Sequence, residues 1–214
     1  MDSEKKIKIK QIVALHNLLR VKMTKTKWSL PLTGDCLRYM AMEASEVIDA
    51  ELRQNRDHAR NNVRMQAETA VGVELADVII MGLSALKAIE GEYGYLGATA
   101  EAIDKAAGTT LEEGIDGVIG DIIVVDAGIC LEDYMMIVSN DETAIELAFL
   151  SRSIGKTIGH AYGMMIKLGF DPLVFVKNKC QGFAVKHGEN YKENYGIEVS
   201  DSLEELYSGF TFSG

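Results

Sequence analysis

Two pairs of acidic residues stand out in the sequence, because their types and spacing could build a metal site. Glu43 and Glu46 are three residues apart, and so are Glu74 and Asp77. On a helix this spacing places both carboxylates of a pair on one face. If the two helices pack face to face, four carboxylates converge, and their mutual repulsion requires a cation. Carboxylate oxygens are ligands that suit Mg²⁺ or Mn²⁺.

The neighbours of these acids indicate a buried setting rather than a solvated helix face. A solvated face would carry Lys or Arg one turn away from the acids, and neither helical stripe contains one. Acids removed from water need a partner, and a metal is the economical one. Apolar or small residues surround both pairs: Tyr39, Met42 and Ala50 around the first, and Ala70, Val71, Val73, Leu75, Val78, Ile79, Ile80, Met81 and Leu83 around the second.

A helical hairpin is expected to position the two pairs. The apolar periodicity predicts helices over roughly 35–55 and 64–90. The polar segment 53–62 between them is expected to form the tip of the hairpin. Pro31 and Gly34 mark the loop that precedes the first helix.

Further helices are expected on both sides of this hairpin, and a glycine and a proline mark where the last of them begins. Gly169 is expected to end one helix, and Asp171-Pro172 to open the final one, because a cap residue followed by proline is typical of a helix start. The segments 72–80 and 117–124 are weakly alike, which indicates either a decayed duplication or two similar buried helices. The additional helices are expected over about 5–24, 99–107, 115–136, 141–168 and 171–186.

The composition indicates one globular helical domain and argues against a nucleic-acid-binding surface. Of 214 residues, 47% are hydrophobic and two are prolines, which favours long helices around a sizeable core. We expect a single all-α domain over 1–214, with 91–114 as a candidate insertion and 188–214 as a candidate surface tail. The net charge of −10 argues against nucleic acid, which requires clustered Lys and Arg. A phosphorylated small molecule stays compatible, because a bound metal reverses the local sign of charge.

The cysteines and the first residues favour a reducing, cytoplasmic location. Cys36, Cys130 and Cys180 are widely separated and form no disulfide or metal framework, so they are expected to act as small buried hydrophobes. The first ten residues lack the apolar stretch of a secretory signal. No run approaches the ~18 apolar residues of a membrane span. The cytoplasm, of a cell or of a virus-infected host, is the expected location.

The two acidic pairs also carry a family resemblance. E-x-x-E, a 27-residue gap and then E-x-x-D followed by Val-Ile-Ile resemble the MazG-like all-α nucleoside triphosphate pyrophosphohydrolases. These include dimeric dUTPases, dCTP pyrophosphatases and phosphoribosyl-ATP pyrophosphatases. The match covers about 28–90, and Leu168 to Gly188 resembles the family's final helix in part; Phe183 stands about where the family has an asparagine. The resemblance implies a MazG-like helical bundle with a metal-bearing hairpin and additional C-terminal helices, assembled as a dimer or tetramer.

The resemblance further implies a reaction and a set of metal ligands. Mg²⁺, or Mn²⁺, held by Glu43, Glu46, Glu74 and Asp77 would clamp the phosphates of a (deoxy)nucleoside triphosphate. A metal-activated water would attack the α-phosphorus and release the monophosphate and pyrophosphate. Glu46 is also a candidate general base.

Four residues outside the acidic pairs are candidate substrate contacts. Trp28 could stack on a nucleobase or plug the core. Lys179, Lys186 and His187 could contact phosphates or simply be solvated near a helix end.

Two other functions stay open, while several motifs fail on inspection. The chain could be a catalytically silent nucleotide-binding or regulatory protein, or a phosphoribosyl-ATP pyrophosphohydrolase. The Gly-Lys-Thr sequence at 155–157 is not a P-loop, because Leu150 replaces the required glycine. The absence of a His-Asp pair and of E-x-x-H argues against the usual metal phosphohydrolases and against a di-iron bundle. His16 and His160 lie in apolar helices and are expected to be satisfied core residues.

Overall fold

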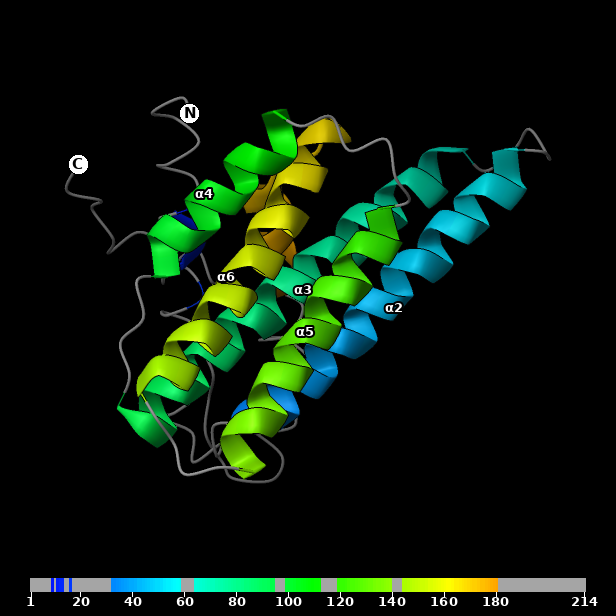
Figure 1. The fold of residues 1–214 in the computed structure, drawn as a ribbon. Helices are drawn as coiled ribbons and strands as arrows, with labels where there is room; N and C mark the ends of the chain where they lie inside the picture. Colours follow the sequence, from blue (N-terminus) through cyan, green and yellow to red (C-terminus); the bar gives the residue numbers. More distant parts are fainter. Residues whose placement is uncertain are drawn as a thin grey trace, which may run out of the picture.

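The computed structural model describes residues 9, 11–13, 16, 32–58, 64–94, 99–112, 119–139 and 144–180, and its elements are helices (Figure 1). The predicted all-α class is therefore confirmed. Most of the predicted helix over 5–24 lies outside the described residues, and so does all of the predicted tail over 188–214. Residues 172–180 form a further helix. The named helices are α2 (Thr33–His58), α3 (Arg64–Tyr93), α4 (Thr99–Glu112), α5 (Ile119–Ser139) and α6 (Ala144–Lys167).

Four long helices form a bundle around one core. α2 packs on α3, α5 packs on α2, and α6 contacts both α3 and α5, so that the four helices close a ring. α4 lies outside this ring against α6 (Figure 1). The two hairpin helices contain 26 and 30 residues, which corresponds to lengths of about 39 and 45 Å.

Side chains near the end of one helix cap the start of another and fix the direction of the chain. The backbone N–H of Thr33, at the start of α2, donates to Glu92 Oε1 (2.5 Å) in the last turn of α3. The N–H of Gly120, at the start of α5, donates to Glu51 Oε2 (2.9 Å) late in α2. The first N–H groups of a helix lack partners within the helix and favour an anion. These two links make α2 antiparallel to both α3 and α5.

The apolar faces of the four bundle helices meet in the core. Their side chains recur with helical spacing, which is why the periodicity predicted the elements correctly. Burial of these side chains is the main stabilising term of the fold. Fully buried examples are Leu37, Met40 and Val47 in α2, Leu75, Val78 and Ile79 in α3, Ile123 and Cys130 in α5, and Leu150 and Ile154 in α6.

α4 approaches α6 unusually closely, because one side of α6 carries small residues. Gly155, Gly159 and Gly163 follow one another at intervals of four residues and face α4. α4 extends to Glu112, beyond the predicted 99–107, and its Ile103 is part of the core. The residues of α4 that lie over the three glycines are Ala102, Ala106 and Thr110.

A tight turn after α6 returns the chain to the bundle. Gly169 has a φ of 80°, a left-handed conformation that glycine adopts without strain. The N–H of Phe170 donates to Met165 O (2.9 Å), as expected for a helix that ends with glycine in this conformation. The prediction that Gly169 terminates this helix is therefore confirmed.

The last described helix begins as the sequence predicts. The Asp171 carboxylate accepts a hydrogen bond from the backbone N–H of Leu173 (3.0 Å), and Pro172 is the first helical residue. Aspartate caps the free N–H groups of the first turn, where proline loses nothing. The expected end of this helix near Lys186 lies outside the described residues.

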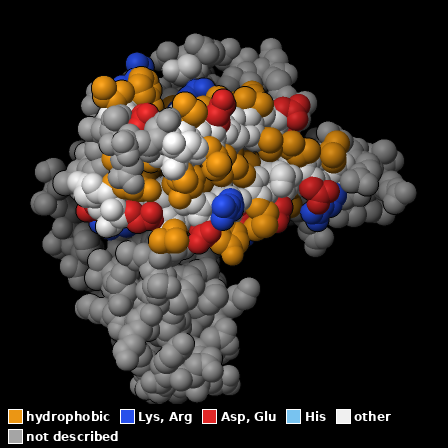
Figure 2. All heavy atoms as spheres, turned by 60° about the horizontal axis from the view of Figure 1, so that its bottom comes forward, with side chains coloured by type: hydrophobic (Ala, Val, Ile, Leu, Met, Phe, Trp, Pro, Cys, Tyr) orange, Lys and Arg blue, Asp and Glu red, His pale blue; other side chains and the backbone are white. Residues whose placement is uncertain are grey.

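Apolar side chains also reach the surface of the bundle. Figure 2 shows them as a band across one face, with charged side chains along its margins. Contiguous exposed apolar surface is typical of contact sites, and the expected homo-oligomer stays a prediction. In the described part of the chain, no helix has the length and hydropathy needed to cross a membrane. Exposed examples are Tyr39 and Met42 in α2, Val125, Ile129 and Met136 in α5, and Ile145 and Phe149 in α6.

Candidate functional site

The helical hairpin brings three of the four predicted acids together. Glu43 and Glu46 lie on α2, and Glu74 lies on α3. One carboxylate oxygen from each residue lies within 4.8 Å of the other two. The i,i+3 spacing and the antiparallel packing of α2 and α3 together produce this convergence.

The three carboxylates stand at the edge of the core rather than inside it. Glu43 and Glu74 are half-buried, and Glu46 is exposed. Ala44 and Leu75, the next residues along each helix, are completely buried. The predicted burial of the acids is therefore wrong for Glu46, which is exposed. The apolar surroundings lie on one side of the cluster, and the other side is open to solvent, where Tyr39 and Met42 of α2 are also exposed.

Asp77, the fourth predicted acid, is held by a lysine from a distant part of the chain. The Lys179 Nζ donates to Asp77 Oδ2, and the two side chains are 32% and 17% exposed. They are 102 residues apart in sequence. No Lys or Arg lies within four residues of either acidic pair along the hairpin helices, and Lys179 reaches Asp77 from the helix 172–180.

Burial and mutual repulsion raise the pKa values of the acids. Burial, followed by the charges of Asp77, Glu46 and Glu74, raises the pKa of Glu43 from 4.5 to about 7. Burial also raises the pKa of Glu74 and of Asp77, and in both cases Lys179 acts in the opposite direction. For Glu74 and Asp77, burial therefore raises the pKa by more than the charge of Lys179 lowers it.

The donor set fits a hard divalent cation. Glu43, Glu46 and Glu74 offer oxygen ligands alone, which is the chemistry that Mg²⁺ and Mn²⁺ prefer. The opening beside Glu46 leaves room for water, which Mg²⁺ usually retains. Raised pKa values show that a positive charge at this position would be favourable. The role of these residues as metal ligands stays a prediction.

Glu43 should make the stability of the metal-free protein depend on pH. Its folded pKa of about 7 lies above the value of 4.5 for the isolated group, so the folded state holds the proton more tightly than the unfolded state. The contribution of protonated Glu43 to the free energy of unfolding is complete below pH 4.5. This contribution is lost as the pH rises through about 7. We expect Glu43→Gln to raise the melting temperature at about pH 8 and to flatten its pH dependence. Thermal unfolding in a chelator measures both.

A matched control for this variant lies on the exposed face of α5. Glu132 is exposed and lies outside the acidic cluster, so Glu132→Gln should leave the pH dependence of wild-type melting unchanged. A melting temperature of Glu43→Gln that follows the wild-type pH curve would show that Glu43 titrates normally.

The remaining predicted site residues lie outside the described part of the chain. These are Trp28, Lys186 and His187. Arg53, exposed near the end of α2, pairs with Asp49 of the same helix. Its charge also lowers the pKa of Glu74, so it is a second cation that acts on the cluster.

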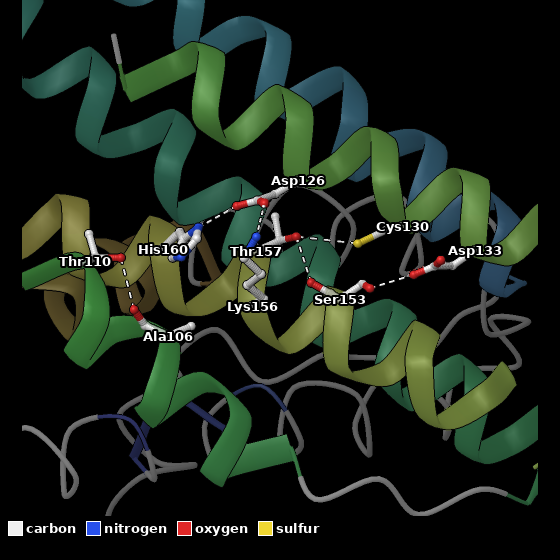
Figure 3. A network of polar contacts seen from close by, with 9 residues as sticks. All are labelled: Ala106, Thr110, Asp126, Cys130, Asp133, Ser153, Lys156, Thr157 and His160. Atoms are coloured by element: carbon white, nitrogen blue, oxygen red, sulfur yellow. Dashed lines mark hydrogen bonds and ion pairs between the residues drawn. The ribbon is translucent and has the colours of Figure 1, made fainter. Parts of the chain in front are cut away.

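A second polar cluster, on other helices, joins α5 to α6 (Figure 3). The buried Asp126 of α5 accepts hydrogen bonds from His160 Nδ1 (2.5 Å) and Lys156 Nζ (2.9 Å) of α6. Burial by itself raises the pKa of Asp126, but these two donors outweigh it and lower the pKa below 3.8. Asp126 is therefore a compensated charge, and His160 is a satisfied core residue as predicted. His16 is likewise buried, with its Nε2 3.0 Å from Ser84 Oγ.

The compensated Asp126 should contribute to stability at neutral pH. We expect Asp126→Asn to lower the free energy of unfolding by about 1.5–3 kcal/mol, the usual worth of hydrogen bonds to a charged group. Because the folded pKa is depressed, this contribution is present above pH 3.8 and is lost in stronger acid. Urea unfolding at neutral pH measures the loss. The exposed Asp121 in the first turn of the same helix provides a control: Asp121→Asn should lower stability by less than about 1 kcal/mol, the usual worth of an exposed acid at the start of a helix. Equal effects of the two variants would contradict a special role of Asp126.

The cysteines take the structural role expected of them. Cys36, Cys130 and Cys180 are buried, and none of them forms a disulfide within the described part of the chain. Burial raises the pKa of Cys130 and of Cys180 to about 12, which keeps both thiols protonated and unreactive.

Comparisons of the chain with protein-family models, with curated proteins and with solved structures found no match.

Proposed function

We propose that the protein is a metal-dependent pyrophosphohydrolase that cleaves a (deoxy)nucleoside triphosphate to the monophosphate and pyrophosphate. The observation that carries the proposal is the convergence of Glu43, Glu46 and Glu74 within 4.8 Å at the edge of a hairpin. The resemblance of the E-x-x-E and E-x-x-D pattern to MazG-like enzymes supplies the reaction. A bound divalent cation would neutralise phosphate oxygens and lower the pKa of an attacking water.

The residues of the site divide this work according to their surroundings. Glu43 and Glu74 are half-buried and have raised pKa values, which suits groups that gain most from a cation. Glu46 is exposed, so its carboxylate can meet a water at the open side and accept a proton from it. Asp77 would be the fourth metal ligand when its carboxylate is not paired with Lys179. The negative cluster without metal would repel a triphosphate, so metal and nucleotide should bind together.

The pairing of Asp77 with Lys179 favours a second candidate function. A protein in which lysine permanently replaces the metal would bind a nucleotide or a partner without turning it over. Such a silent protein would keep the fold and lose the dependence on divalent ions. Phosphoribosyl-ATP is a third candidate, since its hydrolysis uses the same chemistry.

A phosphate-release assay separates these functions. The protein is incubated with Mg²⁺ and each common NTP, dNTP or phosphoribosyl-ATP, and inorganic pyrophosphatase converts released pyrophosphate to phosphate for detection. The proposal expects release with at least one nucleoside triphosphate after incubation with Mg²⁺. It expects none after incubation in a chelator, with Mg²⁺ restored only once the protein has been removed, because the pyrophosphatase itself requires Mg²⁺. Release with phosphoribosyl-ATP alone would assign the third candidate. Nucleotide binding without release would assign the silent protein.

A further inference from the structure

Lys179 is positioned by packing, and is not a chance neighbour of Asp77. The helix that carries it is held against α3 by Phe170 and Phe175, whose rings lie 5.0 Å apart. Both rings lie directly over Gly72 of α3, where a Cβ atom would approach each to 2.9 Å. The turn at Gly169 fixes where this helix starts. The two phenylalanines and the glycine that they cover therefore hold the helix 172–180 where the ammonium group of Lys179 lies beside the acids.

The charge of Lys179 acts on the whole cluster and not on Asp77 alone. It acts against the rise in the pKa of Glu43, Glu74 and Asp77 that burial causes. Lys179 therefore favours the ionised form of these carboxylates, as a bound divalent cation would, but with one positive charge instead of two. Two cations that compensate the same carboxylates must weaken each other's binding.

We propose that Lys179 is a built-in competitor of the metal: its ammonium group holds Asp77 when no divalent ion is bound and leaves Asp77 when one binds. This inference rests on the proposed metal site and concerns its regulation. A lysine is suited to this role because its point charge sits on a flexible stem, and the side chain is 32% exposed, so it can swing into solvent.

The exchange of Lys179 for a divalent ion at Asp77 would couple metal binding to the binding of an anion. A divalent ion that takes Asp77 sets free a positive charge next to itself. An anionic group that binds the freed ammonium would prevent its return to Asp77, so that anion and metal raise each other's affinity. Polyphosphate is the class of anion that combines with both a divalent ion and an ammonium group.

The first test measures Mn²⁺ binding by calorimetry in three full-length proteins. Lys179→Met removes the competitor and should tighten Mn²⁺ binding by between about 5- and 150-fold, the usual range for coupled equilibria. Lys167→Met removes one charge from an exposed position at the end of α6 and should change binding less than about twofold. Equal Mn²⁺ affinity in wild type and Lys179→Met would overturn the competition while leaving the proposed function intact. No Mn²⁺ binding by any of the three proteins would overturn both.

The second test uses the unmodified protein, so it does not depend on whether a variant folds. The rate at which Lys179 is acetylated by a small reagent is followed by peptide mass spectrometry, with and without Mn²⁺. Release from Asp77 should raise this rate severalfold, while the rate at the exposed Lys167 stays constant. A rate at Lys179 that Mn²⁺ leaves unchanged or lowers would overturn the proposal.

Discussion

Replacing Glu74 by glutamine is expected to abolish Mg²⁺-dependent turnover of nucleoside triphosphates. The variant keeps the shape of the side chain but removes one of three carboxylates that converge within 4.8 Å. Removing a group that merely supports a metal ligand costs about 10–100-fold in activity or affinity, so losing a ligand should cost more than about 100-fold. The measurement is the initial rate of pyrophosphate release at saturating Mg²⁺, together with the Kd for Mn²⁺.

Two comparisons keep this expectation open to contradiction. Glu132→Gln makes the same chemical change on the exposed face of α5 and should retain the wild-type rate. The fold of Glu74→Gln should be intact, because burial already raises the pKa of Glu74 and a neutral side chain relieves that cost. Wild-type turnover in a folded Glu74→Gln protein would remove the acidic cluster from the reaction.

The sequence carried enough information to predict the helices but not how closely they pack. Apolar side chains at helical spacing identified each bundle helix, and the Gly169 and Asp171-Pro172 signals marked the last turn correctly. The sequence predicted that α4 ends near 107, whereas it ends at Glu112. Its last turns are held in place because Thr110 packs over Gly163 of α6. Packing against a neighbouring helix stabilises residues whose own propensity is weak.

The close pairs of acids could be predicted from the sequence, but the contact between Asp77 and Lys179 could not, because these two residues lie far apart along the chain. The i,i+3 spacing is a local signal, and it correctly brought Glu43 and Glu46 together. The partner of Asp77 is 102 residues away, and no local pattern reports such a pair. Lys179 was a candidate phosphate contact, and the structure places its ammonium group beside Asp77 of the same cluster. His160 likewise needed the α5–α6 contact before Asp126 could be recognised as its partner.

A large loss of stability is expected from Gly159→Ala in α6. A Cβ atom there would lie 2.5 Å from the Cβ of Ala106, 2.6 Å from the carbonyl oxygen of Ile103 and 2.9 Å from the N of Ala107. Two of these atoms belong to the backbone of α4, so α4 itself would have to move away from α6. Overpacking of this kind costs about 1–3 kcal/mol. For a chain of this size the melting temperature falls about 2–4 °C per kcal/mol.

Gly128→Ala provides the matched control, because it makes the same change where space is free. Gly128 lies within α5, is exposed, and has nothing within 4 Å of the position that an added methyl group would occupy. Alanine in an exposed helix interior is favoured over glycine by about 0.5–1 kcal/mol, so this variant should be slightly more stable than wild type. Thermal unfolding followed by circular dichroism at 222 nm compares the two variants. Opposite signs would identify close contact between α4 and α6 as the cause, since helix propensity acts equally at both positions. A stabilising Gly159→Ala would mean that α4 rests less tightly on α6 than these distances require.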